Sequence, residues 1–411
     1  MKRVVITGCG LVTPLGRSVE EVWRRIVRGE SGIKPLTEGP LSIFRAKMAG
    51  LCDDFSTDGY MEPKNARRID RFTQFALVSA IDAVRASGLD FGREDPYRCG
   101  VVIGCGVGGL GEIEHQQDRL REMGPTRVSP FAIPKIMLNA AAGQVAIEYQ
   151  LHGPVRGVAT ACASANDAMG EAYRNIALGQ ADVVIAGGTE SAVTQLGLSG
   201  FCAMRALSER NDDPTGASRP FDRNRDGFVL SEGAGILVFE EREHALKRGA
   251  PILGELLGYG ASTDARHITQ PDQDGVCAAR AIASALESAG LAPDEIDYIN
   301  AHGTGTILGD IAETAAIHRT FGSAARSAAI SGTKSQLGHL LGGSGGVELI
   351  ITLLAMRDGI VPPTINLTEP DPQCDLDFTP GTAREKKIRR AISNSFGFGG
   401  HNACIVVGGM E

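Results

Sequence analysis

Short strand-like runs alternate with longer helical patterns along nearly the whole chain. In the first half, strand-like runs occupy residues 4–6, 100–103, 155–160, 181–186 and 235–239, and helical patterns occupy 19–27, 72–86, 136–149 and the segment after Cys162. Strands that alternate with helices predict largely parallel sheets covered by helices. The 53 glycines suit the tight strand-to-helix turns that such a fold needs. The sequence therefore predicts an α/β fold.

The second half of the chain repeats this alternation. Strand-like runs lie at 252–259, 296–300, 328–331, 391–395 and 403–407, and helical patterns lie at 277–289, 312–318 and from about 344 to Gly359. No polar linker separates the halves, and the turn near Gly249 is the natural boundary. We expect two similar βα units with mixed sheets, residues 1–250 and 251–411, packed into one layered body.

Composition excludes several classes of protein. The formal net charge of −8 argues against a nucleic-acid partner, which would need a broad basic surface. Nine scattered cysteines, with no Cys-x-x-Cys pair, argue against a disulfide framework or a zinc ribbon and favour a reducing compartment. The N-terminal segment has no long apolar signal region, and the apolar stretch 347–356 is too short to cross a bilayer. We expect a cytoplasmic protein without a membrane partner.

Cys162 occupies the most distinctive position in the chain. It follows a strand-like run and begins a helical pattern whose apolar face continues through Ala165, Met169, Ala172 and Ile176. The positive end of a helix favours a thiolate over a thiol, and the thiolate is the nucleophilic form. This position predicts covalent catalysis through Cys162.

Three further segments with chemically useful side chains each follow a strand-like run. They are Asn300-Ala-His-Gly-Thr-Gly-Thr306, Gly332-Thr-Lys-Ser-Gln-Leu-Gly-His339 and Asn394-Ser-Phe-Gly-Phe-Gly-Gly-His401. Ligands gather at the carboxyl ends of parallel strands. We therefore expect His302, Lys334, His339 and the loop around Phe398 to converge with Cys162 on one site.

These motifs, together with Thr160-Ala-Cys162, Ser218-Arg-Pro-Phe-Asp222 and Val361-Pro-Pro-Thr-Ile-Asn366, give the chain a specific resemblance to a known family. In this order and spacing they resemble the β-ketoacyl-acyl carrier protein synthases II, condensing enzymes of the thiolase-like superfamily. The resemblance covers essentially the whole chain. It implies a layered α/β/α/β/α fold, a homodimer and acyl carrier protein as the partner.

The resemblance implies decarboxylative Claisen condensation in fatty acid synthesis, with no cofactor and no catalytic metal. Cys162 would hold an acyl group while a malonyl thioester loses its carboxylate. The backbone N–H groups of Cys162 and Phe398 would form the oxyanion hole, and His302 and His339 would stabilise the enolate. Lys334, paired with Glu348, would act either as electrostatic support or in proton handling.

Two further sets of residues receive roles from the resemblance. Val107, Ala132 and the gating Phe398 would line the acyl pocket. Val107 and Ala132 replace an isoleucine and an aromatic residue that are common in straight-chain synthases, which predicts a wider or deeper pocket. Lys64, Arg67, Arg68 and Arg71 have helical spacing after Pro63, which predicts one basic face. Lys64, Arg67 and Arg68, with Arg127 and Arg205 as weaker candidates, would bind the acidic carrier protein.

Other functions compete with this interpretation. A polyketide-type ketosynthase shares all the residues named, and a non-catalytic partner subunit that sets chain length shares the fold but lacks the nucleophile. A degradative thiolase would need a second catalytic cysteine where Phe398 and His401 stand. The segment Gly104-Cys-Gly-Val-Gly-Gly109 matches a dinucleotide-binding pattern, but a polar helical segment follows it in place of a second strand ending in an acid. We interpret these glycines as a tight turn.

Overall fold

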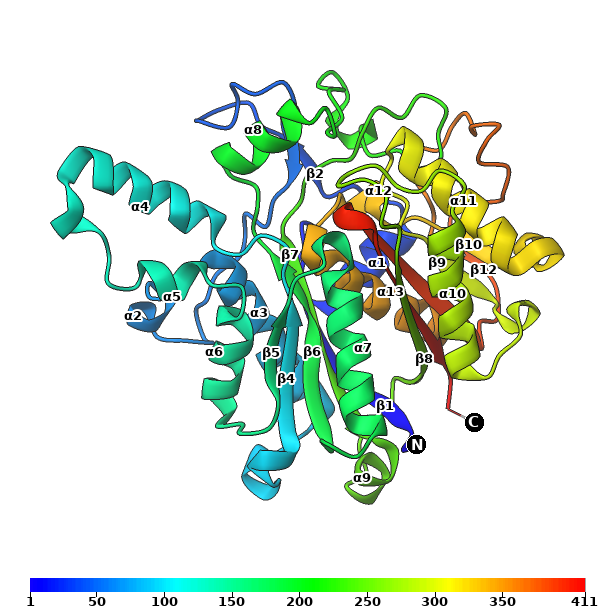
Figure 1. Ribbon diagram of the computed structural model, residues 1–411, viewed down its shortest axis with the longest axis horizontal. Coiled ribbons are helices and arrows are strands. Elements are labelled where there is room, and N and C mark those ends of the chain that lie inside the picture. Colours follow the sequence, from blue (N-terminus) through cyan, green and yellow to red (C-terminus); the bar gives the residue numbers. More distant parts are fainter. Residues whose placement is uncertain (411) are drawn as a thin grey trace.

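The computed structural model describes residues 1–410 and has a ten-stranded mixed sheet at its centre (Figure 1). The strands run in the order β10-β9-β13-β14-β8-β1-β7-β6-β4-β5. Their bounds are β1 Val4–Val12, β4 Cys99–Gly104, β5 Val155–Val158, β6 Val183–Glu190, β7 Gly233–Glu241, β8 Gly254–Thr263, β9 Tyr298–Asn300, β10 Ala329–Ser331, β13 Arg390–Gly397 and β14 His401–Gly408. Two small antiparallel pairs lie outside it: β2 (Ile33–Pro35) with β3 (Met48–Gly50), and β11 (Ile360–Val361) with β12 (Arg384–Glu385).

The two halves of the central sheet have the same topology. In the first half β5, β4 and β6 are parallel, and β7 and β1 follow antiparallel. In the second half β10, β9 and β13 are parallel, and β14 and β8 follow antiparallel. The halves join where β1 pairs antiparallel with β8. We propose that they are two units with bounds 1–250 and 251–411, since the chain passes from the first half to the second between β7 and β8.

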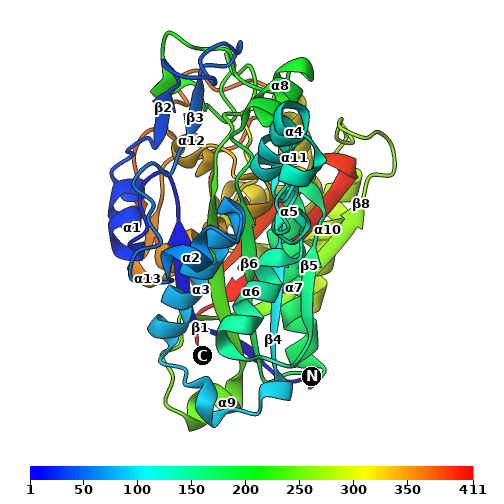
Figure 2. The ribbon, with the colours of Figure 1, turned by 90° about the vertical axis from the view of Figure 1, so that its left-hand side faces the viewer.

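Helices complete a layered α/β/α/β/α arrangement (Figures 1 and 2). On the first half of the sheet, α3 (Arg71–Ser87) packs against β1 and β7 and α6 (Ala140–Tyr149) against α3, β4 and β5. On the second half, α10 (Val276–Ala289) packs against β8 and β14 and α11 (Ile307–Phe321) against α10. Between the halves, α7 (Ser164–Ala177) contacts β4 and β6, and α13 (Ser344–Asp358) contacts β7, β13 and α7.

The central helix α13 has apolar residues on every side, with Glu348 as a buried exception, and every residue from Ser344 to Ala355 is buried. A helix of this kind has no solvent face and can only be placed inside a core. Its position in the middle layer, beside α7, brings the N-terminal ends of both helices to one place in the interior, because the turns that precede them also contact each other. Those two turns are η4 (Ala161–Ala163) and η8 (Leu341–Gly343).

Seven further helices belong to the described residues. They are α1 Val19–Val27, α2 Pro63–Ala66, α4 Leu110–Met123, α5 Ala132–Ile136, α8 Gln195–Ala203, α9 Arg242–Lys247 and α12 Lys334–Leu337. Helices α4 and α5 project from the body on the left of Figure 1. Among the helices of residues 1–410, none combines the length and the apolar character needed to cross a membrane.

The helix expected over 136–149 is present from Ala140 to Tyr149 as α6, but its expected start is wrong. Met137 adopts an extended backbone with ψ 132°, which ends α5 at Ile136 and separates it from α6. The β5 backbone passes directly against the break: a Cβ on Gly157 would lie 2.9 Å from Asn139 Cα. Tertiary packing therefore ends the helical pattern at a place where the local sequence would allow it to continue.

The expected single basic face is also wrong. Helix α2 ends at Ala66, and Asp70 begins a new helix by accepting the N–H of Phe72 at 3.2 Å. Arg71 then belongs to α3 and binds the buried carboxylate of Glu232 at 2.7 Å. The exposed basic surface therefore consists of Lys64, Arg67 and Arg68 and does not include Arg71.

Candidate active site

Cys162 lies at the predicted junction of strand and helix, but in the η4 turn that joins β5 to α7, two residues before the helix that it was expected to begin. Its side chain is buried, and the preceding Ala161 has a left-handed backbone with φ +51°. The Ser164 hydroxyl closes the turn, because it donates to the Ala161 carbonyl at 2.6 Å and accepts the Thr160 N–H at 2.9 Å. The predicted apolar face of the following helix is confirmed, since its four residues are all buried: Ala165, Met169, Ala172 and Ile176.

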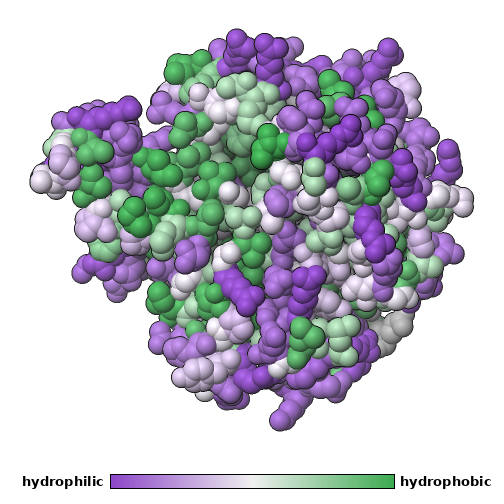
Figure 3. All heavy atoms as spheres, viewed as in Figure 1, coloured by the Kyte–Doolittle hydropathy of each residue, from purple (hydrophilic) through white to green (hydrophobic). Residues whose placement is uncertain are grey.

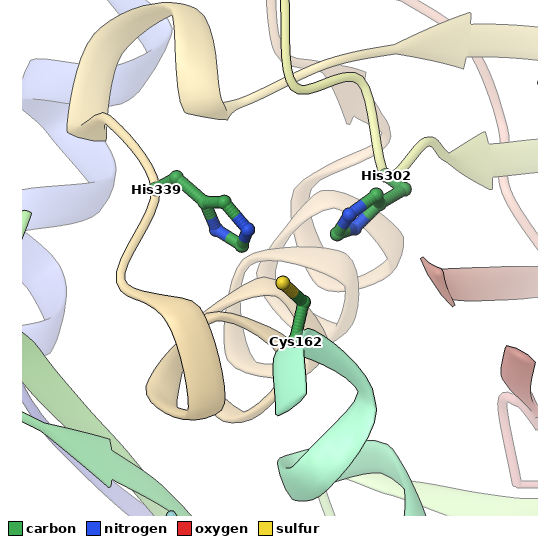
Figure 4. Close-up of side chains that lie close together, drawn as sticks. All are labelled: Cys162, His302 and His339. Carbon is green, nitrogen blue, oxygen red and sulfur yellow. The ribbon is translucent and has the colours of Figure 1, made fainter. Parts of the chain in front are cut away.

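Two imidazole rings from distant segments face the sulfur of Cys162. His302 follows β9, and His339 lies between α12 and η8. The sulfur points into the space between the rings (Figure 4). Atoms of the three side chains lie within 4.8 Å of one another, and the ring centroids are 5.3 Å apart at an interplanar angle of 84°. The predicted convergence of Cys162, His302 and His339 is therefore present in the structure.

His302 is held from both its backbone and its ring. Glu313 on α11 accepts the N–H groups of His302 and Gly303, each at 2.8 Å. Lys334 Nζ donates to the His302 carbonyl at 2.6 Å and lies 3.3 Å from the ring Nδ1. Because an ammonium group can only donate, Nδ1 accepts this hydrogen bond, and a neutral His302 ring then carries its proton on Nε2.

Lys334 and Glu348 form an ion pair inside the protein. Both side chains are 2% exposed, and Lys334 Nζ donates to Glu348 Oε1. Burial raises the pKa of Glu348, and the neighbouring Lys334 opposes that rise. The pairing implied by the resemblance is therefore present, at the first residue of α12 and one turn inside α13.

His339 is oriented by Ser344, the first residue of α13. Its Nδ1 lies 3.0 Å from Ser344 Oγ, which accepts the Leu340 N–H at 2.9 Å. The Ser344 hydroxyl proton is thus free to be donated to Nδ1, which leaves the His339 proton on Nε2. That Nε2 is buried and has no hydrogen-bond partner among the described residues. Burial and the Lys334 charge hold the pKa of both imidazoles well below the ordinary value, so both rings are neutral.

The protonation state of Cys162 differs from the prediction, because the structure favours a thiol where the sequence predicted a thiolate. Burial raises its pKa to about 11, and the carboxylate of Glu190 adds to the rise. The backbone N–H groups of Phe398 and Cys162, together with Lys334, act in the opposite direction. Desolvation therefore outweighs the helix end, and the resting side chain is a thiol. The same contacts aim two backbone N–H donors at the sulfur.

The loop after β13 brings Phe398 to this position. A Cβ on Gly397 would lie 2.9 Å from the Cys162 backbone nitrogen, so only glycine allows the loop to approach so closely. Gly399 and Gly400 have φ of +82° and +75°, a region that other residues rarely adopt. Phe398 itself is half-buried at the cavity.

A cavity of about 90 Å³ opens onto the sulfur. Its lining includes Cys162, His302, His339, Leu341, Phe396 and Phe398. Val107 and Ala132 do not belong to the lining of this cavity within the described chain; Val107 is 37% exposed, and Ala132 is buried at the start of α5. Their expected role in an acyl pocket stays a prediction.

The basic candidates occupy two regions of the surface. Lys64, Arg67 and Arg68 lie in or just after α2, and Arg127 ends the turn η3 (Pro125–Arg127) that follows α4. The Arg68 guanidinium stacks on Phe131 with 5.2 Å to the ring centroid. Arg205 follows α8 and lines a separate surface hollow together with Arg45. All five candidates are exposed, and within residues 1–410 none forms an ion pair.

Sequence reasoning missed three residues that organise the site: Glu190, Glu313 and Ser344. Glu190 ends the apolar strand β6, and Glu313 lies on α11 among apolar neighbours. An acidic residue at a position that the pattern predicts to be buried was the available signal. Ser344 begins α13 and gave no signal apart from its place at a helix start.

Among the described residues, Cys162, His302 and His339 are also the one cluster close enough to hold a metal ion. The hydrogen bond from Lys334 to Nδ1 of His302 argues against that use, because it places the ring proton on the nitrogen that a metal would need. The cluster is arranged as a thiol between two N–H donors.

Family models match most of the chain. A model described as "Beta-ketoacyl synthase, N-terminal domain" matches residues 1–245, and one described as "Beta-ketoacyl synthase, C-terminal domain" matches residues 253–368.

Curated relatives and solved structures are similar over the full length. Proteins named 3-oxoacyl-[acyl-carrier-protein] synthase 2 from Synechocystis sp. and Coxiella burnetii are each 48% identical, covering 98% and 99% of this chain and 97% and 98% of theirs. A β-ketoacyl synthase structure from Burkholderia phymatum has a TM-score of 0.92 at 36% identity, with both chains covered completely. A ketosynthase solved with its type II PKS acyl-carrier protein has a TM-score of 0.93 at 33% identity, again with complete coverage.

Proposed function

The chain belongs to the β-ketoacyl synthase family, and we propose that Cys162, His302 and His339 carry out its condensation of an acyl group with a malonyl thioester. The observation that carries this proposal is the meeting of one sulfur and two neutral imidazoles within 4.8 Å. Full-length relatives at 45–48% identity are 3-oxoacyl-[acyl-carrier-protein] synthases, whereas the solved polyketide ketosynthase is 33% identical. The chain is thus a condensing enzyme, and fatty acyl elongation is favoured over a polyketide pathway.

In the first half-reaction the Cys162 sulfur attacks the carbonyl of an acyl thioester. A new thioester forms on Cys162, the old carbon–sulfur bond breaks, and the Cys162 proton ends on the sulfur of the departing carrier. The tetrahedral intermediate carries an oxyanion, which the N–H groups of Cys162 and Phe398 are placed to bind. Loss of one such donor typically costs about 3 kcal/mol in the transition state.

In the second half-reaction a malonyl thioester replaces the departed carrier. Its terminal carbon–carbon bond breaks, carbon dioxide leaves, and the thioester carbonyl becomes an enolate. The Nε2–H groups of His302 and His339 bind the enolate oxygen. The carbanion then attacks the acyl carbonyl on Cys162, and the expelled thiolate takes a proton from solvent. The product is a β-ketoacyl thioester longer by two carbons.

Lys334 has a role distinct from those of the imidazoles in this scheme. It touches neither the sulfur nor the cavity in the structure, but it binds the carbonyl and the Nδ1 of His302. A cation there fixes the His302 tautomer that donates toward the enolate. We therefore assign Lys334 to electrostatic and tautomeric support of His302, with Glu348 as its counter-ion.

The experiment that tests this function uses the purified chain with acyl- and malonyl-loaded carrier protein. We expect mass spectrometry to find an acyl group on the Cys162 peptide and a β-ketoacyl product after malonyl carrier is added. Iodoacetamide should label Cys162, and prior acylation should block that label. An enzyme that makes product while Cys162 stays unmodified throughout would contradict the proposal.

We also propose a homodimer formed through the β5 side of the molecule. Strand β5 is an edge strand of the sheet, and Val155 to Gly157 are exposed. Exposed apolar side chains gather around it, over α4 to α6 (Figure 3). They are Ile113, Phe131, Ile133, Met137, Ile147 and Val155. An uncovered sheet edge with an apolar surround is a pairing site, and a second copy offers the same edge. Light scattering should give twice the 43.2 kDa of one chain.

We propose that the surface around α2 binds the acidic carrier protein. Lys64, Arg67 and Arg68 are exposed and have no carboxylate partner within the described residues, and Arg127 lies on the nearby η3 turn. Complementary charge would speed docking of an acidic partner. Arg67→Glu should raise the KM for acyl carrier protein several-fold and leave the KM for a small acyl thioester unchanged. Arg93→Glu is the control, since Arg93 is an exposed cation already paired with Asp90.

A further inference from the structure

Glu190 is a fully buried carboxylate that receives five donors. It is the last residue of β6 and is 0% exposed. Oε1 accepts from the Cys105 thiol at 3.1 Å and from the N–H groups of Val107 and Gly108 at 3.1 and 3.3 Å. Oε2 accepts from the N–H groups of Gly106 at 2.8 Å and Gly342 at 3.2 Å. The carboxylate thus joins the loop 105–108 to the turn 341–343.

No cationic side chain of residues 1–410 forms an ion pair with this carboxylate. Three other buried carboxylates, Glu232, Glu240 and Glu348, are each paired with an arginine or a lysine, whereas Glu190 forms no ion pair within residues 1–410. Burial raises the pKa of Glu190, and the donated hydrogen bonds oppose that rise. Burying a carboxylate without a counter-ion costs free energy, even when four backbone N–H groups and a thiol donate to it. We expect the fixed position of the two backbone segments to be what this cost secures.

Both segments carry a glycine at a position where packing around this carboxylate leaves no room for a side chain. A Cβ on Gly106 would lie 2.8 Å from Glu190 Oε2, and a Cβ on Gly342 would lie 2.5 Å from the Gly106 nitrogen. The two segments therefore touch each other as well as Glu190. The glycine pattern Gly104 to Gly109, which resembles a dinucleotide motif, serves in the structure to wrap a loop around a carboxylate.

Both segments border the site of Cys162. A Cβ on Gly106 would also lie 3.6 Å from the carbonyl oxygen of Ala161, in the turn that carries Cys162. Leu341, which precedes Gly342, lines the cavity and packs in one apolar cluster with Cys162. A φ of +46° is strained for a leucine. Contacts from outside the turn are therefore needed to keep the Leu341 side chain in the lining of the cavity.

We propose that Glu190 is a positioning residue that sets acyl-chain preference, by clamping the loop of Val107 onto the turn of Leu341 beside Cys162. The proposal rests on the proposed function in that the acyl group is carried by Cys162. The carboxylate touches neither the acyl group nor the sulfur. It acts through the two pieces of backbone that flank the acylated residue.

Three variants separate the geometry of the clamp from its charge. Glu190→Gln keeps the size of the side chain but replaces acceptors by an N–H₂ group that faces backbone donors. Glu190→Asp keeps the charge but is one methylene too short to reach both segments. Glu240→Gln is the matched control, because Glu240 is an equally buried acid on β7 that binds Thr7, His244 and Arg248 outside the cavity.

The measurement is the rate of Cys162 acylation by octanoyl and palmitoyl carrier protein, followed by mass spectrometry. We expect the ratio of the two rates to change roughly tenfold in Glu190→Gln and Glu190→Asp, and to stay at the wild-type value in Glu240→Gln. The pH midpoint of Cys162 alkylation gives a second readout. It should fall in Glu190→Gln, because the carboxylate raises the pKa of that thiol, and stay in place in Glu190→Asp.

An unchanged acylation ratio in the folded Glu190 variants would overturn the proposal and leave Glu190 a stabilising residue only. Should Glu190→Gln fail to fold, the ratio in Glu190→Asp decides the matter. Failure of the proposed function would look different, since the wild-type chain itself would then form no acyl-Cys162 with either substrate.

Discussion

Removing the ammonium group of Lys334 should destabilise the protein in a pH-dependent way. Lys334→Met leaves the carboxylate of Glu348 buried without its counter-ion, a change that costs about 4 kcal/mol in buried ion pairs. The entropy of unfolding is about 2.1 cal/mol/K per residue, or about 0.86 kcal/mol/K for the 411 residues of this chain. The expected fall in Tm at pH 8 is therefore about 5 °C.

The pH dependence follows from the pKa of Glu348. Burial already raises that pKa in the wild-type protein, and Lys334 limits the rise. Without Lys334 the folded-state pKa rises further above the unfolded value of about 4.3. A raised carboxyl pKa favours the folded state at low pH and loses that contribution as pH rises through it. The difference in Tm between variant and wild type should thus shrink as the pH is lowered from 8 toward 5.

Thermal unfolding followed by circular dichroism measures this effect, and Glu348→Gln completes a double-mutant cycle. Glu348→Gln alone strands the cation, and the double variant should recover at least about 2 kcal/mol relative to the sum of the single changes. Arg357→Met is the surface control, because its exposed pair with Glu20 should contribute less than about 1 kcal/mol. A Lys334→Met protein as stable as wild type at pH 8, or equally destabilised at both pH values, would refute the reasoning.

Three further predictions concern the chemistry. Replacement of His302 or His339 by Ala should slow carbon–carbon bond formation about 10²–10³-fold while acyl transfer to Cys162 continues, as single-turnover assays of each half-reaction would reveal; equal loss in both half-reactions would contradict their assignment to the enolate. Alkylation of Cys162 by iodoacetamide should keep accelerating up to a pH of about 11, because burial raises the pKa of this thiol; a plateau near pH 7 would show a resting thiolate instead. Val107→Ile combined with Ala132→Phe should shift the acyl profile toward shorter chains, and an unchanged profile would remove both residues from the acyl pocket.

Local pattern was enough to predict the elements that carry the site. Cys162, His302, Lys334 and His339 each follow a strand-like run, and the carboxyl ends of parallel strands meet at one edge of a sheet, which predicts that they converge. Of the repeated topology of the two sheet halves, the sequence shows only that strand-like runs and helical patterns alternate in both halves. Pairing between strands far apart in the chain, such as β1 with β8, leaves no local trace.

Properties that depend on desolvation or tertiary contact escaped the sequence. The helix end at Cys162 suggested a thiolate, but the extent of burial decides the balance and cannot be read from neighbouring residues. The break between α5 and α6 comes from the approach of β5, and the division between α2 and α3 lets Arg71 reach Glu232. Glu190 stands out only as an acid at a position predicted to be buried, because its partners, the Cys105 thiol and four backbone N–H groups, are brought together by the fold alone.

The depth of the proposed catalytic side chains has a consequence for a carbanion formed beside them. Cys162, His302 and His339 are 7%, 6% and 2% exposed. Bulk water would quench a carbanion by giving it a proton, turning the malonyl unit into an acetyl unit without any chain growth. Under the proposed mechanism, burial of these side chains would limit the contact of a carbanion with bulk water and so favour its attack on the acyl carbonyl held by Cys162.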